Sequence, residues 1–252
     1  MSPRQLLVLL SGAVALLGLA AGVGALGGPP VAGAAAGALA TEASLVAPAG
    51  PAVAVWTPIS AGLAAFAVWQ AGGARRHDER VRRVDVPLAV SMVAGAGWVV
   101  AARAGVPWLT AVLIVMVLVS LVVAYGRLLA DAPRGRWERV LLDGTTGLYL
   151  GWVSVATVAH VVALGEASPL AGAPPGRTAW SVLVVALTGV VAERVTWQGR
   201  GRLAFPAAVV WALGWVAVAR TAGTTESTAV ALAAVLAAVT VAGTAAVARR
   251  RR

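Results

Sequence analysis

The residues from Trp108 to Tyr125 read WLTAVLIVMVLVSLVVAY, a stretch without any charged side chain. A helix of about 20 mainly apolar residues spans the hydrocarbon core of a bilayer, so this stretch predicts a transmembrane helix. Similar stretches lie on both sides of it: Leu6–Leu26, Val53–Gln70, Val86–Ala104, Val140–Leu164, Ala179–Val195, Leu203–Ala219 and Ser227–Val247. The sequence therefore predicts an all-α integral membrane protein, with an eight-helix transmembrane bundle.

The composition agrees with this class. Of the 252 residues, 60% are hydrophobic and 12% are charged, whereas soluble domains carry about 25% charged residues. The net charge of +10 lies in short loops between the spans, where anionic lipid headgroups account for it. We therefore expect the lipid bilayer as a partner and no nucleic acid. The chain has no cysteine and two histidines, which excludes thiol chemistry and leaves too few ligands for a histidine-based metal site.

The arginines predict the orientation. All 20 basic residues are arginines, and 17 of them fall on one side of the predicted membrane. Because loops rich in arginine stay in the cytoplasm, we expect a multi-pass protein of the cell (plasma or inner) membrane with both termini cytoplasmic. An even number of spans fits this arrangement. The first span could instead be a signal peptide, but a retained helix preserves the alternation of the arginines.

Only one outer connection is long, Gly27–Ala52, and it contains no arginine. Its Gly28-Pro29-Pro30 should end the first helix, because proline cannot continue a helical hydrogen-bond pattern. Its alanine-rich part, Val31–Ala40, could form a short helix at the membrane surface. Connections of this length are typical of lids and binding loops.

Two spans carry glycines four residues apart, Gly18 with Gly22 and Gly147 with Gly151. Small residues at this spacing let helices approach closely in lipid, where apolar burial provides little driving force. We expect both helices to lie inside the bundle. The same faces permit a homodimer.

The fifth predicted span is the least lipid-like. At 100° per residue, one arc of about 80° holds Thr145, Tyr149, Trp152, Ala156 and His160. Polar groups inside a membrane usually face the bundle or a cavity, so this face is expected to line a pocket. The alternative is that Tyr149 and Trp152 only pack against neighbouring helices and that His160 is an interfacial histidine.

Two further aromatic residues fall on the same half of the predicted membrane. Trp56 begins the second span just below the outer surface, one turn before Ser60, and Trp98 lies in the outer half of the third span. Most other tryptophans lie near span ends, where anchoring at the interface is the ordinary explanation. Trp211 and Trp215 are four apart in the seventh span and are expected to pack on a neighbour.

Three separated motifs resemble one family. Pro48-Ala49-Gly50 with Val55-Trp56-Thr57 is similar to the start of the second helix in the tryptophan-rich sensory proteins (TspO/MBR), the family of the mitochondrial translocator protein. Trp98 lies where this family has the Trp of an Asn-x-x-Trp motif. The stretch from Tyr149 to Thr157, YLGWVSVAT, resembles the signature of its fifth helix. The resemblance implies a five-helix core over residues 1–165, followed by three additional transmembrane helices over residues 166–252.

The resemblance also implies a function. Relatives bind porphyrins, sterols and other hydrophobic molecules between these helices, under the loop that joins the first two. Here the pocket would lie toward the outer leaflet and would be formed by Trp56, Trp98, Tyr149 and Trp152, with His160 able to ligate a metalloporphyrin or to bond a propionate. No cofactor is required, and a porphyrin or other tetrapyrrole is the expected kind of ligand.

The chain departs from the family pattern at three positions. Gly95 replaces the Asn of the third-helix motif, Ser60 replaces a Tyr, and His160 stands where Asn is usual. Two polar contacts that the family pattern offers a ligand are therefore expected to be missing here.

The leading hypothesis is thus a membrane ligand-binding or sensory protein of the TspO type that takes a flat hydrophobic molecule. A transporter of small solutes or hydrophobic compounds is one alternative, although Asp85, Asp143 and Glu193 all lie near the inner border and not at mid-membrane, where carriers keep ionisable groups. A non-catalytic partner in a membrane assembly is another. An enzyme is not expected, because the sequence has no phosphate-binding loop and no Ser/His/Asp set.

Overall fold

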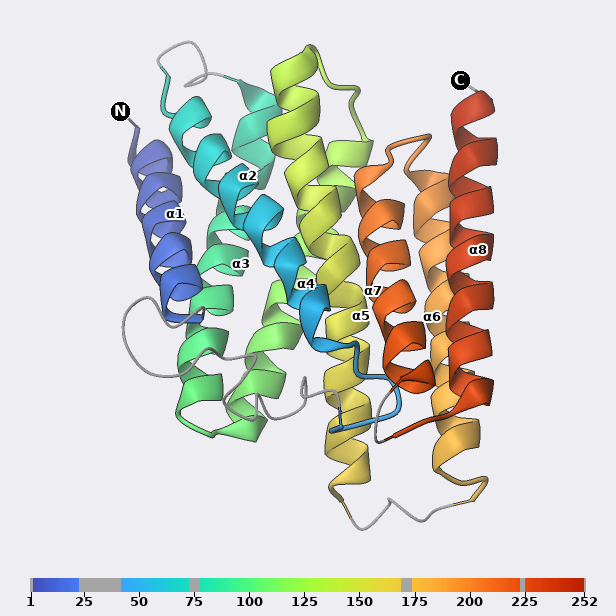
Figure 1. Ribbon diagram of the computed structural model, residues 1–252. Helices are drawn as coiled ribbons and strands as arrows, with labels where there is room; N and C mark the ends of the chain where they lie inside the picture. The colour runs from blue at the N-terminus through green and yellow to red at the C-terminus, as the bar shows by residue number, and fades with distance from the viewer. Residues whose placement is uncertain (1, 23–41, 73–77, 169–173, 223–224, 252) are drawn as a thin grey trace. The chain divides into compact units, whose positions relative to one another are not determined.

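The computed structural model describes residues 2–22, 42–72, 78–168, 174–222 and 225–251 (Figure 1). Within these ranges the regular structure is helical: α1 (Pro3–Gly22), η2 (a 3₁₀ helix, Gly50–Val55), α2 (Trp56–Gln70), α3 (Glu79–Arg103), α4 (Pro107–Leu129), η4 (a π-helix, Glu138–Gly144), α5 (Thr145–Glu166), α6 (Arg177–Gln198), α7 (Ala204–Thr221) and α8 (Thr228–Arg250). Eight of these described segments are long and apolar enough to cross a membrane, which confirms the predicted fold class. Both Gly28-Pro29-Pro30 and the predicted helix Val31–Ala40 lie outside the described residues.

Local sequence signals explain several helix ends. The Asp78 side chain accepts hydrogen bonds from the backbone N–H groups of Arg80 and Val81 and so caps α3. The Ser227 side chain accepts one from Val230 N and caps α8. Pro107 occupies the first turn of α4, where its missing N–H costs nothing.

The spans differ in how many of their residues are buried. In the most apolar part of the span Glu138–Glu166, which joins η4 and α5, 67% of the residues are buried, whereas 28% are buried in Pro3–Ala20 of α1. The prediction that both glycine-paired helices lie inside the bundle is therefore confirmed for α5 and wrong for α1. The reason is that α1 uses one face only, on which a Cβ at Gly18 would lie 2.9 Å from Ala96 Cα.

The chain divides into two compact units. Unit 1 comprises Met1–Ala34 and Val55–Leu150, and unit 2 comprises Ala35–Ala54 and Gly151–Arg252. The boundary drawn from the family resemblance, between residues 165 and 166, stays a prediction.

In unit 1, α3 packs against both α1 and α4. At one end of the unit, α1 and α2 are joined by two buried hydrogen bonds. Gln5 Nε2 donates to Gln70 O at 2.9 Å, and Gln70 Nε2 donates to Gln5 O at 3.0 Å. Each side-chain amide thus donates to the backbone carbonyl of the other glutamine. These hydrogen bonds offset the cost of burying the polar groups away from water.

In unit 2, α8 packs against both α6 and α7. Small residues bring these helices close together, as expected in lipid. A Cβ at Gly189 of α6 would lie 2.8 Å from Ala237 Cβ of α8. Gly151 of α5 lies against the backbone carbonyl of Phe205 on α7.

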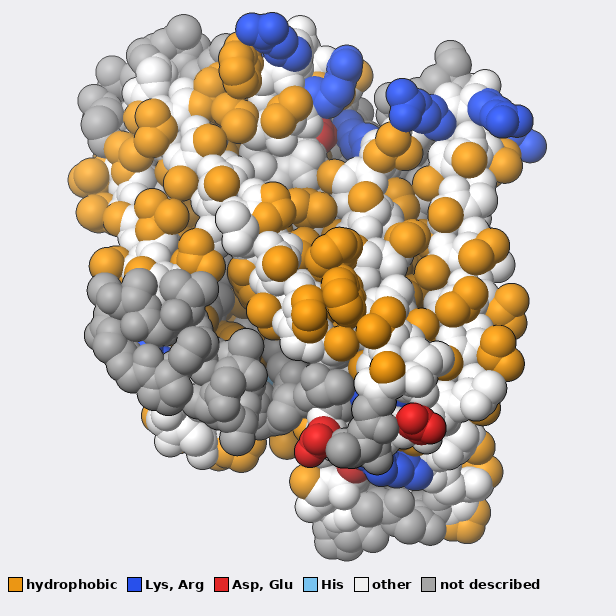
Figure 2. All heavy atoms as spheres, in the orientation of Figure 1, with side chains coloured by type: hydrophobic (Ala, Val, Ile, Leu, Met, Phe, Trp, Pro, Cys, Tyr) orange, Lys and Arg blue, Asp and Glu red, His pale blue; other side chains and the backbone are white. Residues whose placement is uncertain are grey.

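The outer faces of the helices in each unit carry apolar side chains, which Figure 2 shows as a broad hydrophobic cover with arginines gathered near the helix ends. Exposed apolar residues include Val115, Val119 and Val122 of α4 in unit 1, and Leu187, Val191 and Leu236 in unit 2. Such a surface suits contact with lipid acyl chains.

Candidate functional site

Unit 1 brings two of the predicted ligand-binding residues into direct contact. The rings of Trp56, at the start of α2, and Tyr149, on α5, meet edge to face with centroids 5.5 Å apart and an interplanar angle of 66°. Tyr149 is 1% exposed, whereas Trp56 is only half-buried. This arrangement is favourable for aromatic pairs and contributes about 0.5–1.5 kcal/mol beyond the buried area.

A face of α3 supports the Tyr149 side chain. Its hydroxyl donates a hydrogen bond to Ser91 O at 3.3 Å. A Cβ at Gly95 would lie 2.7 Å from the same hydroxyl oxygen, so the absence of a side chain at Gly95 makes room for Tyr149. Ser91, Gly95 and Trp98 share one side of α3 by helical spacing, and Trp98 is buried. The tyrosine hydroxyl thus occupies the space where a side chain at position 95, such as the Asn of the family motif, would begin.

Glycine also lets α5 approach α2 in unit 1. A Cβ at Gly62 would meet the Thr145 side chain, with Thr145 Cγ2 at 2.8 Å. Thr145 is one turn before Tyr149 on the predicted polar face of α5. Tyr149 therefore belongs to a tightly packed corner formed by α2, α3 and α5 within unit 1.

The two remaining predicted site residues lie farther along α5, in unit 2. Trp152 is 1% exposed and His160 is 2% exposed. Within the described residues, Trp152 Nε1 has no hydrogen-bond partner. Glu166, the nearest acid along α5, forms an ion pair with Arg177, with 2.7 Å between Oε2 and Nη2. The assignment of Trp152 and His160 to a ligand site stays a prediction.

Sequence reasoning missed a role for Trp211. In unit 2, Trp211 Nε1 donates a hydrogen bond to Ala52 O at 3.0 Å, and Ala49 N donates to Trp215 O at 3.1 Å. The rings of Trp211 and Trp215 meet edge to face, with 5.6 Å between their centroids. The end of the long connection between α1 and α2 is thereby fastened to α7. The four-residue spacing of the tryptophans is visible in the sequence. No sequence pattern indicates that they bind the segment from Ala49 to Ala52.

Trp211→Phe is expected to loosen this attachment while keeping most of the aromatic contact. Losing one hydrogen bond of about 0.5–1.5 kcal/mol should speed amide hydrogen exchange at Ala49 and Ala52 by about two- to tenfold, measured by mass spectrometry of the purified protein. The control is Trp180→Phe on α6, where the side chain is 46% exposed. Unchanged exchange in Trp211→Phe would contradict this role.

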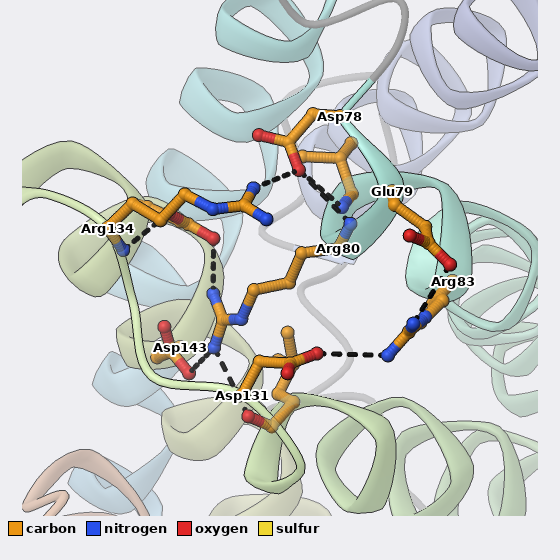
Figure 3. Close-up of polar contacts among 10 residues, drawn as sticks. Asp78, Glu79, Arg80, Arg83, Asp131, Arg134 and Asp143 are labelled. Carbon is orange, nitrogen blue, oxygen red and sulfur yellow. Dashed lines mark hydrogen bonds and ion pairs between the residues drawn. The ribbon is translucent and has the colours of Figure 1, made fainter.

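Sequence reasoning also missed a buried charge cluster in unit 1 (Figure 3). Arg80 is 2% exposed and bonds two acids at once: Nη1 donates to Glu138 Oε1 at 2.7 Å, and Nη2 donates to Asp143 Oδ1 at 2.6 Å. Nη2 also donates to Leu128 O at 3.2 Å. One guanidinium thus joins the start of α3, the end of α4 and η4.

The π-helix makes this pairing possible. Residues five apart lie about 140° apart around an α-helix, so Glu138 and Asp143 would not share a face. In a π-helix the repeating hydrogen bond joins residues five apart, which places the two carboxylates one above the other. Both can then reach Arg80. The wide turn of η4 and the charge cluster therefore depend on each other.

More exposed groups surround the cluster, as Figure 3 shows. Glu138 Oε2 accepts a hydrogen bond from Arg134 N at 2.8 Å, and Arg134 Nη1 donates to Asp78 Oδ1 at 3.0 Å. Arg83 forms ion pairs with Glu79 and with Asp131, both at 2.9 Å. Among the residues that the structure describes, no group of three or more His, Asp or Glu side chains could hold a metal ion.

The helices and their apolar outer faces define a multi-pass α-helical membrane protein. The chain matches the family model described as TSPO-like protein over residues 9–247, and it belongs to this family. The match continues through α6, α7 and α8, beyond the residues whose motifs suggested the family. No curated protein and no solved structure matches the chain.

Proposed function

We propose that this protein is a membrane ligand-binding or sensory protein that takes a flat hydrophobic molecule, such as a porphyrin or a sterol-like compound, against the aromatic corner of unit 1. The observation that carries the proposal is the Trp56–Tyr149 pair, whose rings meet at 5.5 Å while the tyrosine is held from behind by α3. Membership of the TSPO-like family supports the same reading.

The chemistry of this corner suits such a ligand. The Trp56 ring is half-buried, so part of its surface is open to contact, whereas Tyr149 and Trp98 are buried and give the corner a fixed shape. Aromatic walls bury large apolar areas of a flat molecule and stack on it. Ser60 follows Trp56 by one turn of α2, and its buried hydroxyl can form a hydrogen bond with a polar group of the ligand.

The Gly95 side of the corner lies away from the arginine-rich start of α3. Gly95 follows Arg80 by about 22 Å along α3, at 1.5 Å per residue. If arginine-rich ends face the cytoplasm, the ligand is taken from the outer leaflet. The cytoplasmic placement of both termini remains a prediction from the arginine distribution.

Trp56→Ala tests the proposal directly. We expect saturable quenching of tryptophan fluorescence by protoporphyrin in the purified wild-type protein, and an affinity lower by about two- to tenfold in Trp56→Ala, because one aromatic contact of about 0.5–1.5 kcal/mol is lost. The matched control is Trp69→Ala, at the other end of the same helix beside Phe66. The control should retain the wild-type affinity.

Thermal shifts with porphyrins, sterols and carotenoid-like compounds, measured side by side in detergent, identify the ligand class. The ligand should be recovered unchanged, since the proposal involves binding and no chemical conversion. Equal loss of affinity in Trp56→Ala and Trp69→Ala would contradict the site. Uptake into proteoliposomes along an imposed gradient would favour the transporter alternative, and a stoichiometric second protein in the purified sample would favour an assembly partner.

The homodimer stays a prediction. One glycine of each Gly-xxx-Gly pair already packs inside the chain, because Gly18 lies against Ala96 in unit 1 and Gly151 lies against Phe205 in unit 2. These contacts use the close-approach faces from which the dimer was inferred.

A further inference from the structure

Some of the arginines of the protein have acidic partners within it. In unit 1, ion pairs join four arginines to acids: Arg4 to Asp85, Arg80 to Glu138 and Asp143, Arg83 to Glu79 and Asp131, and Arg134 to Asp78. Other arginines of unit 1, such as Arg127 and Arg136, are exposed and form no ion pair with the residues that the structure describes.

In unit 2, exposed arginines without an ion pair gather where α6 and α8 end and α7 begins. Within the described residues, no ion pair is formed by Arg194, Arg200, Arg249, Arg250 or Arg251, and all five are exposed. The one acid near them in sequence is Glu193. These exposed guanidinium groups are therefore available to an anionic group from outside the protein.

The packing of unit 2 gathers this charge. The guanidinium of Arg251 lies over the ring of Trp197, with 5.0 Å from Cζ to the ring centroid, which joins the end of α8 to the end of α6. The turn between α6 and α7 is tight, with positive φ values at Arg200 (47°) and Gly201 (74°). Figure 2 shows arginine side chains gathered at these helix ends.

One exposed stripe of α6 leads directly to this charge. Its members follow one another at helical spacing: Leu183, Leu187, Val190, Arg194 and Trp197. Leu187 is 55% exposed and Val190 is 56% exposed, so both offer apolar surface along the membrane-spanning part of the helix. Arg194 and Trp197 follow at the end, where an indole is suited to the boundary between hydrocarbon and water.

We propose that this stripe is a binding site for one anionic phospholipid. The acyl chains lie along Leu183, Leu187 and Val190, and the phosphate lies between Arg194 and Arg251, beside the ring of Trp197. An extended apolar surface that ends in unpaired arginines fits a phospholipid. A free anion would make no contact with the apolar side chains, and a soluble acidic protein would not reach them inside the membrane. This inference is independent of the proposed ligand site in unit 1.

The test counts phosphatidylglycerol retained by the full-length protein in native mass spectrometry after purification from mixed micelles with phosphatidylcholine. Wild-type protein should retain phosphatidylglycerol in preference to phosphatidylcholine. The double variant Arg194→Gln with Arg251→Gln should bind it at least about tenfold more weakly, since each arginine near an anionic lipid surface contributes about 1 kcal/mol to binding. Replacing both by lysine should preserve most of the binding.

The matched control is Arg127→Gln with Arg136→Gln in unit 1, which removes the same charge from another exposed pair of arginines without an ion pair among the described residues. This control should bind phosphatidylglycerol nearly as well as the wild type, because its arginines lie outside the proposed site. Equal losses in the two double variants would overturn the proposal, and so would displacement of the lipid by millimolar inorganic phosphate.

A measurement on the wild-type protein covers the case in which the double variant does not fold. Salt at about 1 M shortens the screening length to about 3 Å, so it should reduce the preference for phosphatidylglycerol over phosphatidylcholine severalfold. A preference that is unchanged by salt would overturn the proposal.

Discussion

Arg80→Met is expected to lower the free energy of unfolding by about 3–5 kcal/mol, because it leaves two buried carboxylates without their shared cation. Glu138 and Asp143 are each 3% exposed, so water cannot replace the guanidinium without opening the packing of unit 1. The measurement is denaturant- or heat-induced unfolding in detergent, followed by circular dichroism.

Two comparisons make this result specific. Arg83→Met removes an arginine that also bonds two acids, but its side chain is 44% exposed, and exposed pairs contribute about 0–1 kcal/mol. The triple variant Arg80→Met, Glu138→Leu, Asp143→Leu should recover most of the lost stability, since it removes the unpaired charges as well. Equal losses for Arg80→Met and Arg83→Met would show that the buried cluster does not stabilise unit 1.

Gly151→Leu is expected to be the second severe change. Any Cβ at this position would collide with the backbone carbonyl of Phe205 and would lie 2.8 Å from Ala208 Cβ. Backbone cannot move aside as a flexible side chain can, so α5 and α7 must separate within unit 2. Overpacking of this kind costs about 1–3 kcal/mol and occasionally more, and we expect a value at the upper end.

The control for this change lies on the same helix. Gly165→Leu introduces the same side chain where no atom of the described residues lies within 4 Å, and it removes a helical glycine that costs about 1 kcal/mol relative to alanine. Its unfolding midpoint should equal or exceed that of the wild type. Similar midpoints for Gly151→Leu and Gly165→Leu would mean that α5 and α7 are not in close contact.

Most of the fold could be predicted because membrane insertion is controlled by local composition. Each span is a run of apolar residues long enough by itself to cross the bilayer, and each is found as a helix at nearly the predicted place. The fifth span was predicted to begin at Val140, but its helical segment begins earlier, as the π-helix at Glu138. The charged residues at its start do not belong to the apolar run from which the span was predicted. They can be buried because Arg80, on another helix, forms ion pairs with them.

The candidate site could be predicted in part. The contact of Trp56 with Tyr149 agrees with a family resemblance that linked residues far apart in the chain. The pairing of Arg80 with Asp143, by contrast, depends on packing between residues 63 positions apart, for which no local pattern exists. Acids near a span end are usually solvated at the membrane border, so no sequence pattern indicated that these two would be buried.

The wide turn of η4 has a consequence for the helix that follows it. A π turn accommodates more residues than an α turn, so it changes the rotational phase of every side chain that comes after Gly144. The direction in which Tyr149 points is therefore set several residues upstream, where charge and not aromatic packing decides the geometry. If this turn closed to an α turn with the sequence unchanged, the tyrosine ring would rotate away from Trp56 although neither aromatic side chain had changed.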